Sequence, residues 1–119
     1  MPWPYNGTTS RALVTGTRAM VSSAHPQASL AGVQTLASGG NAVDAAIAVS
    51  AALDVCEPFM SGLGGGGAML IHVPGEAPTA LHYGGYFHEA ASLASLTKES
   101  IDIGPKAAVI PGAPAGWLP

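Results

Sequence analysis

The glycines between positions 61 and 67 offer the clearest chemical possibility in this sequence. Gly62-x-Gly64-x-x-Gly67 has the spacing of a dinucleotide-binding fingerprint, and Glu89 follows about twenty residues later. The fingerprint requires a strand before the glycines and a helix after them, so that the pyrophosphate meets the helix N-terminus. Here the expected order is reversed. Two other interpretations stay open: a close approach of backbones, or N–H groups that line a ligand or oxyanion pocket.

Histidines are the next candidates, for metal binding or acid–base chemistry. The chain has four of them: His25, His72, His82 and His88. Metal sites usually combine three or four ligands with local spacing such as His-x-x-x-His, and that spacing is missing here. We therefore expect no metal and no cofactor, with the histidines at the surface or hydrogen-bonded.

Cysteine and serine give no nucleophile that the sequence alone can support. Cys56 is the single cysteine, and it follows an apolar segment without a basic neighbour, so we expect an inert, buried thiol. Ser22, Ser23 and Ser61 lack the strand–turn–helix context of a nucleophile elbow. These residues by themselves name no catalytic group.

Composition excludes several classes of protein. Only 9% of the 119 residues are charged, against roughly 25% in a typical soluble domain, whereas 48% are apolar. Four basic residues and a net charge of −3 exclude a phosphate-neutralising surface and hence nucleic acid as a partner. A disulfide scaffold is excluded by the single cysteine. Such a small number of charged residues covers little of the surface of the chain. We therefore expect that additional protein buries some of its apolar surface.

Targeting and membrane segments are not evident. The first fifteen residues hold no apolar core of a signal peptide. The longest apolar run, residues 45–53, is about half of what spans a bilayer. We expect a protein without a membrane span that is cytoplasmic, or periplasmic or secreted if its N-terminus is processed.

Proline and glycine divide the first half of the chain into a strand and a helix. Residues 19–24 predict a short strand that ends before His25-Pro26. Residues 26–37 predict a helix that Gly39-Gly40 terminates. The small residues of this helix recur at helical spacing, which favours close approach of another element.

Residues 42–55 predict a second helix. Asn41 suits the N-cap, and Asp44 stands three residues on, where a carboxylate meets the unpaired N–H groups. Because nearly all sides are apolar, we expect a buried helix that packs on the downstream sheet. Enlarging Ala46 or Ala48 should then overpack it.

The second half predicts short elements separated by turns. Strands over residues 68–73 and 79–83 form an expected hairpin, followed by a short helix over residues 89–96 and a strand over residues 106–110. The Pro-Gly turn at residues 111–116 should open another helix. Overall, the order of elements indicates a layered α/β or α+β sandwich.

Four blocks of sequence resemble the large-subunit start of gamma-glutamyltransferases, also called glutathione hydrolases. They are MVSSAHPQASLAG at 20–32, LASGGNAVDAAIA at 36–48, VCEPFMSGLGGG at 55–66 and AVIPGAPAG at 108–116. Together the blocks extend over about residues 19–116, in the order of the family. The length and order of the blocks make the resemblance highly specific.

This resemblance implies an α+β fold of the N-terminal-nucleophile hydrolase type, a four-layer αββα sandwich of which only the N-terminal portion is present. Residues 1–18 would be an extension, and residues 19–119 an incomplete segment of the domain. In that family a proenzyme cleaves itself, and the freed N-terminal Thr of the small subunit becomes the nucleophile. The Thr would lie beyond this chain, so no residue here is assigned a catalytic role. The implied partners are an amide or γ-glutamyl substrate, the remainder of the large subunit and the small subunit.

One departure from the family concerns the donor site. Relatives carry an Arg-Glu pair at the end of the second hairpin strand, where the Arg holds the α-carboxylate of the γ-glutamyl donor. Gly84-Gly85 stands there in this sequence. Glycine offers none of the charge-assisted hydrogen bonds of an arginine, so γ-glutamyl specificity is expected to be altered. His82 or His88 could partly substitute.

Two alternatives from other classes stay open. One is a non-catalytic or truncated subunit of the same fold, which a downstream small-subunit sequence beginning with Thr would argue against. The other is a nucleotide-binding module built on the glycine run.

Overall fold

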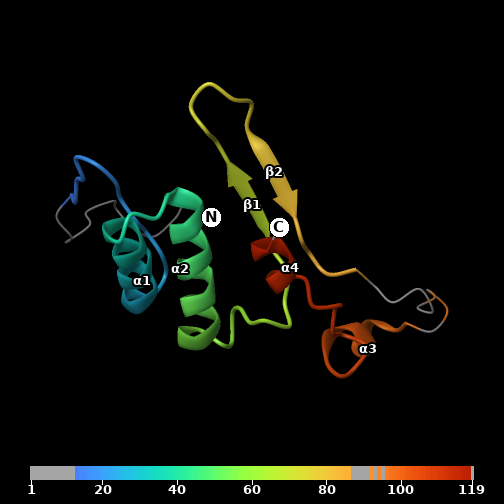
Figure 1. Ribbon diagram of the computed structural model, residues 1–119. Coiled ribbons are helices and arrows are strands. Elements are labelled where there is room, and N and C mark those ends of the chain that lie inside the picture. The colour runs from blue at the N-terminus through green and yellow to red at the C-terminus, as the bar shows by residue number, and fades with distance from the viewer. Residues whose placement is uncertain (1–12, 87–91, 93, 95, 119) are drawn as a thin grey trace, which may run out of the picture.

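The computed structural model describes residues 13–86, 92, 94 and 96–118. Two helices lie side by side, and an antiparallel hairpin and two short helices follow along the chain (Figure 1). The elements are α1 (Pro26–Ala37), α2 (Ala42–Cys56), β1 (Ala68–Ile71), β2 (Thr79–His82), α3 (Lys98–Asp102) and α4 (Ala113–Trp117). The helix expected over residues 89–96 falls largely outside the described residues.

Helix α1 has the predicted bounds, with Pro26 and Gly39 acting as expected and with an N-cap that the sequence analysis did not name. His25 is the N-cap, and its Nδ1 accepts a hydrogen bond from the Gln27 N–H at 3.2 Å. Pro26 occupies the first turn, where its missing N–H costs no hydrogen bond. After the helix, Gly39 has a φ of +96°, a left-handed conformation that favours glycine.

Helix α2 begins as predicted, with a reciprocal capping box. The Asn41 Oδ1 accepts hydrogen bonds from the N–H groups of Val43 (2.7 Å) and Asp44 (3.1 Å). In return, the Asn41 N–H donates to Asp44 Oδ2 at 2.8 Å. The helix extends to Cys56, one residue beyond the expected end.

The two helices pack through small residues. Ala28 and Gly32 of α1 are buried. A Cβ added at Gly32 would lie 2.7 Å from Val49 Cγ2 of α2 and 2.9 Å from Val21 Cγ1. The small face predicted for α1 therefore serves close approach of α2 and of the extended segment before α1.

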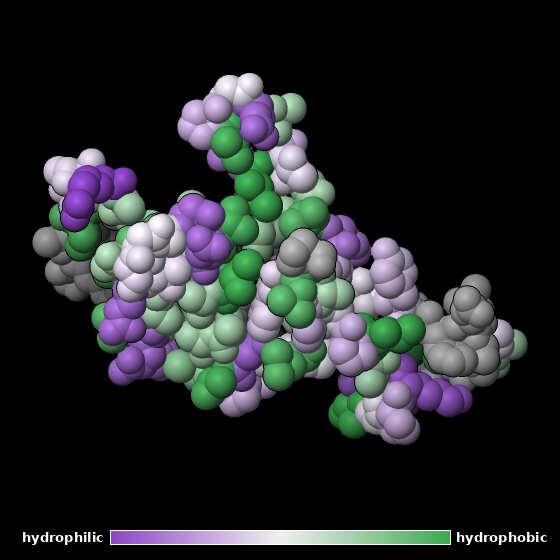
Figure 2. Space-filling view, in the orientation of Figure 1, coloured by the Kyte–Doolittle hydropathy of each residue, from purple (hydrophilic) through white to green (hydrophobic). Residues whose placement is uncertain are grey.

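The prediction that α2 is buried on nearly every side is wrong for this chain. Only Ala45 is buried, Val55 is 79% exposed, and a cavity separates part of the helix from β1. The apolar sides of α2 therefore exceed what α1 and the hairpin can cover. Figure 2 shows apolar surface along the hairpin and on the adjoining part of the molecule.

Two predicted strands are also not formed. Neither residues 19–24 nor residues 106–110 form a strand in the structure. A strand needs a partner to pair its backbone groups, and within the described ranges neither segment pairs with β1 or β2. These two segments have residues that favour strands, but they remain irregular because no strand lies beside them to pair with their backbone groups.

The predicted hairpin is confirmed, with strands one or two residues shorter than expected. Its register pairs Ala68 with His82 and Leu70 with Ala80. The Gly67–Tyr83 pair continues the ladder, because Tyr83 N–H donates to Gly67 O at 2.9 Å and Gly67 N–H to Tyr83 O at 3.3 Å.

The last two helices are short, and only α4 was expected. A capping box begins α3, where hydrogen bonds from the Glu99 backbone and the Thr97 side chain hold the pKa of Glu99 below its usual value. The buried apolar side chains of the described part are three alanines, Ala28, Ala45 and Ala113. The Cα radius of gyration is 18.2 Å, against about 13–14 Å for a compact domain of this length. No described helix is long and apolar enough to cross a membrane.

Candidate functional site

Three segments meet at Tyr83, at the end of the hairpin. The glycine loop before β1 pairs with Tyr83 through Gly67, and Gly65 O accepts hydrogen bonds from the N–H groups of Gly112 (2.8 Å) and Ala113 (3.0 Å) at the start of α4. The Ile110 N–H donates to Tyr86 O at 3.2 Å. The glycine loop, the end of β2 and residues 110–113 thus form one backbone junction.

Glycine is required at this junction because side chains have no room. A Cβ at Gly67 would lie 2.8 Å from Tyr83 Cε2, and one at Gly66 would lie 2.7 Å from Gly84 Cα. A Cβ at Gly116 would meet the Tyr83 ring from α4. Sequence analysis missed Tyr83 as the centre of the junction, although an aromatic residue directly before two glycines was a usable signal.

The structure excludes one interpretation of the glycine run and supports another. Helix α2 precedes it and strand β1 follows it, which is the reverse of a dinucleotide-binding turn. The N–H groups of Gly65 and Gly67 already donate to Gly62 O and Tyr83 O, so neither serves as a donor to a ligand. Close approach of backbones is the interpretation that the geometry supports.

Gly84 and Gly85 are in different surroundings. A Cβ at Gly84 would meet only the His82 imidazole, 2.8 Å from Nε2 and 2.9 Å from Cε1. By contrast, a Cβ at Gly85 would meet Val109 and lie 2.9 Å from the Ile110 carbonyl oxygen. Position 84 therefore opens toward a movable side chain, whereas position 85 is closed by the backbone of the junction.

The remaining histidines and serines do not gather around this junction. His25 caps α1, His72 is exposed just after β1, and His88 lies outside the described residues. Ser23 Oγ donates to the His25 carbonyl at 2.9 Å and lies 2.7 Å from Ser29 Oγ, which gives it a local structural role. Across the described ranges, no three His, Cys, Asp or Glu side chains are grouped to hold a metal.

Cys56 is half-buried at the end of α2 and is not disulfide-bonded. Ser61 is exposed in the loop that follows. Ser22 lines a cavity rather than a nucleophile elbow. None of these groups contacts Tyr83 or Gly84 through a recorded hydrogen bond, so they form no catalytic arrangement in the part of the chain that is described.

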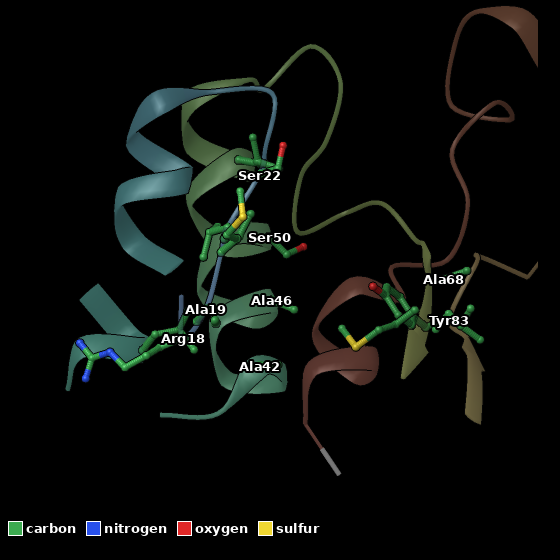
Figure 3. Close-up of a pocket in the computed structure, with 16 residues that line it drawn as sticks. Arg18, Ala19, Ser22, Ala42, Ala46, Ser50, Ala68 and Tyr83 are labelled. Atoms are coloured by element: carbon green, nitrogen blue, oxygen red, sulfur yellow. The ribbon is translucent and has the colours of Figure 1, made fainter. Parts of the chain in front are cut away.

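A cavity of about 720 Å³ lies between α2 and the hairpin. One stripe of α2 borders it, and Figure 3 shows Ala46 and Ser50 pointing toward the side of Ala68 and Tyr83. The Arg18 side chain points away from the hairpin (Figure 3). Most of the residues that line this cavity are apolar, and Arg18 is the charged residue among them. Such a lining suits protein packing more than recognition of a polar ligand.

Comparison with known protein families identifies the family that shares this sequence. The family model of gamma-glutamyltranspeptidase matches residues 28–119. The chain belongs to the gamma-glutamyltranspeptidase family. The matched part includes α1 except for its first two residues, all of α2, the hairpin, and the whole junction at Tyr83.

Curated relatives of this family member are proenzymes. It is 54% identical over 57 residues to the glutathione hydrolase proenzyme of Bacillus subtilis, which covers 48% of this chain and 10% of the relative. It is 42% identical, over an alignment of 117 positions, to the acylase ACY 1 proenzyme of a Pseudomonas strain, with 87% of this chain and 21% of the relative covered. The chain thus spans between a tenth and about a fifth of the length of these relatives.

Solved structures give the same assignment of the fold. The gamma-glutamyltranspeptidase of Helicobacter pylori superposes with a TM-score of 0.82 at 31% identity, covering 89% of this chain and 32% of that one. The transpeptidase CapD of Bacillus anthracis gives a TM-score of 0.64 at 36% identity, covering 87% and 30%. The family member described here therefore has the fold of part of these transpeptidases.

Proposed function

We propose that this chain is the N-terminal segment of the large subunit of a gamma-glutamyltransferase-like amide hydrolase or acyltransferase. The match over residues 28–119 and the superposition on a transpeptidase three times as long carry this proposal. Residues 19–119 would contribute to a four-layer αββα sandwich of the N-terminal-nucleophile type, with residues 1–18 as an extension. The remainder of the large subunit and the small subunit would be its partners.

The proposed chemistry is acyl transfer through an activated hydroxyl. A Thr freed by self-cleavage would attack the amide carbonyl with its own α-amine as the base, and the acyl group would pass to water or to an amine. This Thr lies outside residues 1–119. The described segment would contribute the framework around Tyr83 and the wall of the donor site.

We further propose that the donor site differs from one that grips a carboxylate with arginine. Gly84 and Gly85 follow β2, and no Arg occurs after Arg18. Acyl donors without a free α-carboxylate would therefore be better substrates than γ-glutamyl donors. Among the described residues, the exposed His82 imidazole is the polar side chain that lies beside Gly84.

The alternative is a non-catalytic subunit of the same fold. Few side chains of this segment are buried, which favours packing against further protein. This holds for a catalytic and for a non-catalytic subunit, so it does not distinguish the two proposals. The distinguishing feature is a downstream sequence that begins a small subunit with Thr.

The test is expression of the complete gene that contains this segment. Self-cleavage should produce a fragment beginning with Thr, and the processed protein should hydrolyse amide donors. We expect kcat/KM for a γ-glutamyl donor to fall below that for its decarboxylated analogue. Absence of both cleavage and hydrolysis would support the non-catalytic alternative, and a strong preference for the carboxylated donor would contradict the altered donor site.

A further inference from the structure

The His82 imidazole occupies the space that a side chain at position 84 would need. Successive residues of a strand point to opposite faces, so positions 82 and 84 share one face where the chain leaves β2. A Cβ at Gly84 would lie 2.8 Å from His82 Nε2 and 2.9 Å from Cε1, and its three nearest atoms all belong to this ring. Gly84 is not among the glycines with positive φ. The glycine therefore makes room for the ring rather than serving an unusual backbone conformation.

The two ring nitrogens of His82 are available to a ligand. The side chain is exposed, and within the described ranges no hydrogen bond or ion pair engages it. Its neighbours on the same face of the hairpin are Ala68, Leu70 and Ala80, so no carboxylate of β1 or β2 lies beside it there. The hydrogen-bonding capacity of this imidazole is thus unused in the described part of the protein.

His82 is also the source of positive charge closest to the end of β2. The sequence holds no Lys or Arg between Arg18 and Lys98. Of the described histidines in that range, His25 caps α1, and His72 lies just after β1, at the opposite end of the antiparallel hairpin. Where β2 ends, His82 is therefore the described side chain that can meet an anionic group with a charge.

We propose that His82 is the specificity-determining residue of the donor site, where its imidazole binds a carboxylate of the acyl donor. The neutral ring donates one ordinary hydrogen bond to a carboxylate oxygen, whereas the protonated ring donates a stronger, charge-assisted one. The preference for donors that carry an α-carboxylate therefore grows as the pH falls. This inference rests on the proposed function, because it takes position 84 as part of the wall of the donor site.

Other titratable groups around His82 do not account for such a pH dependence. His82 lines a cavity of about 510 Å³ together with residues of α2, the hairpin and α4. The described residues that line it include no Asp or Glu, and the other titratable group among them is Tyr83. Histidines ordinarily gain their charge between about pH 8 and pH 5, whereas tyrosines ordinarily titrate near about pH 10.

Donor preference at two pH values tests the proposal in the complete, processed protein. The measured quantity is the ratio of kcat/KM for a γ-glutamyl anilide to kcat/KM for its decarboxylated analogue, a γ-aminobutyryl anilide. This ratio should rise about 5- to 10-fold between about pH 7.5 and pH 5.5, where the carboxylate of the donor stays ionised. Both donors are cleaved by the same nucleophile, so its own titration cancels in the ratio. A ratio that does not change overturns the proposal.

Variants assign the pH dependence to a residue. His82→Gln should abolish the rise, because the glutamine amide donates a hydrogen bond but gains no charge. His72→Gln is the matched control, since His72 is exposed at the far end of the hairpin, and this variant should keep the rise. His82→Lys should hold the ratio high at both pH values, because an ammonium group is charged at both. A rise of full size in a folded His82→Gln variant would overturn the proposal.

NMR of the complete protein gives a second measurement, which requires neither turnover nor a variant. The signals of the His82 ring nitrogens, assigned through the backbone, should shift when L-glutamate is added at about pH 5.5 and should not shift with γ-aminobutyrate. Ring signals that neither compound moves would overturn the proposal. Shifts induced by glutamate in a protein that neither cleaves itself nor hydrolyses a donor would count against the proposed function alone.

Discussion

The His82 imidazole lies over Gly84, so that a side chain at position 84 would begin 2.8 Å from His82 Nε2. Gly84 is not among the glycines with positive φ. Neither the backbone conformation nor a rigid neighbour therefore forbids a larger residue there. The neighbouring Gly85 is enclosed by Val109 and the Ile110 carbonyl. A side chain is therefore excluded at position 85 by its surroundings, whereas position 84 has room for one.

Gly84→Arg should improve binding of donors that carry an α-carboxylate. A guanidinium supplies two charge-assisted hydrogen bonds, and we expect about a 10- to 100-fold gain in kcat/KM for a γ-glutamyl donor over its decarboxylated analogue, which corresponds to about 1.5–3 kcal/mol. Gly85→Arg is the matched control: it should lower Tm through its clash with the junction and give no such gain. An unchanged donor preference in a folded Gly84→Arg variant would place the carboxylate elsewhere.

Gly32→Ala should destabilise the protein by about 1–3 kcal/mol, because the added methyl group meets Val49 and Val21 across the α1–α2 contact. Urea unfolding of the complete protein measures this change. Gly62→Ala serves as the control, because a Cβ there meets nothing within 4 Å. Similar stability of the two variants would mean that the helices move apart at little cost.

Asn41→Ala should cost about 0.5–2 kcal/mol, because the N–H groups of Val43 and Asp44 lose their acceptor. Asn41→Ser should restore most of the stability, since a serine hydroxyl also caps helices. Thermal unfolding followed by far-UV circular dichroism compares the three proteins. A serine variant as unstable as the alanine variant would indicate that Asn41 acts through something other than the cap.

The 119-residue chain alone should not hydrolyse a γ-glutamyl anilide at any pH, because the proposed nucleophile and its amine lie outside it. The assay is release of the aniline by purified chain, with protein from a host that lacks its own gamma-glutamyltransferase. Turnover that persists in this preparation would show that the segment carries a nucleophile of its own.

Local signals in the sequence determined α1, α2 and the hairpin, but they did not predict α3. His25 and Pro26 start α1, Gly39 ends it, and the Asn41–Asp44 pair starts α2, each through contacts within a few residues. Such contacts need no distant partner, so their types and spacing were sufficient. The family resemblance was likewise contained in the linear order of four sequence blocks, and the family assignment is confirmed.

Tertiary structure alone decided the outcome wherever a residue depends on distant neighbours. Residues 19–24 and 106–110 have strand-like composition, yet a strand forms only where another edge pairs with it. The apolar composition of α2 predicted burial, but burial depends on what surrounds the helix, and α1 and the hairpin cover only part of it. Tyr83 lies at the centre of the junction because glycines far apart in sequence pack against its ring. Only the folded chain brings these glycines together.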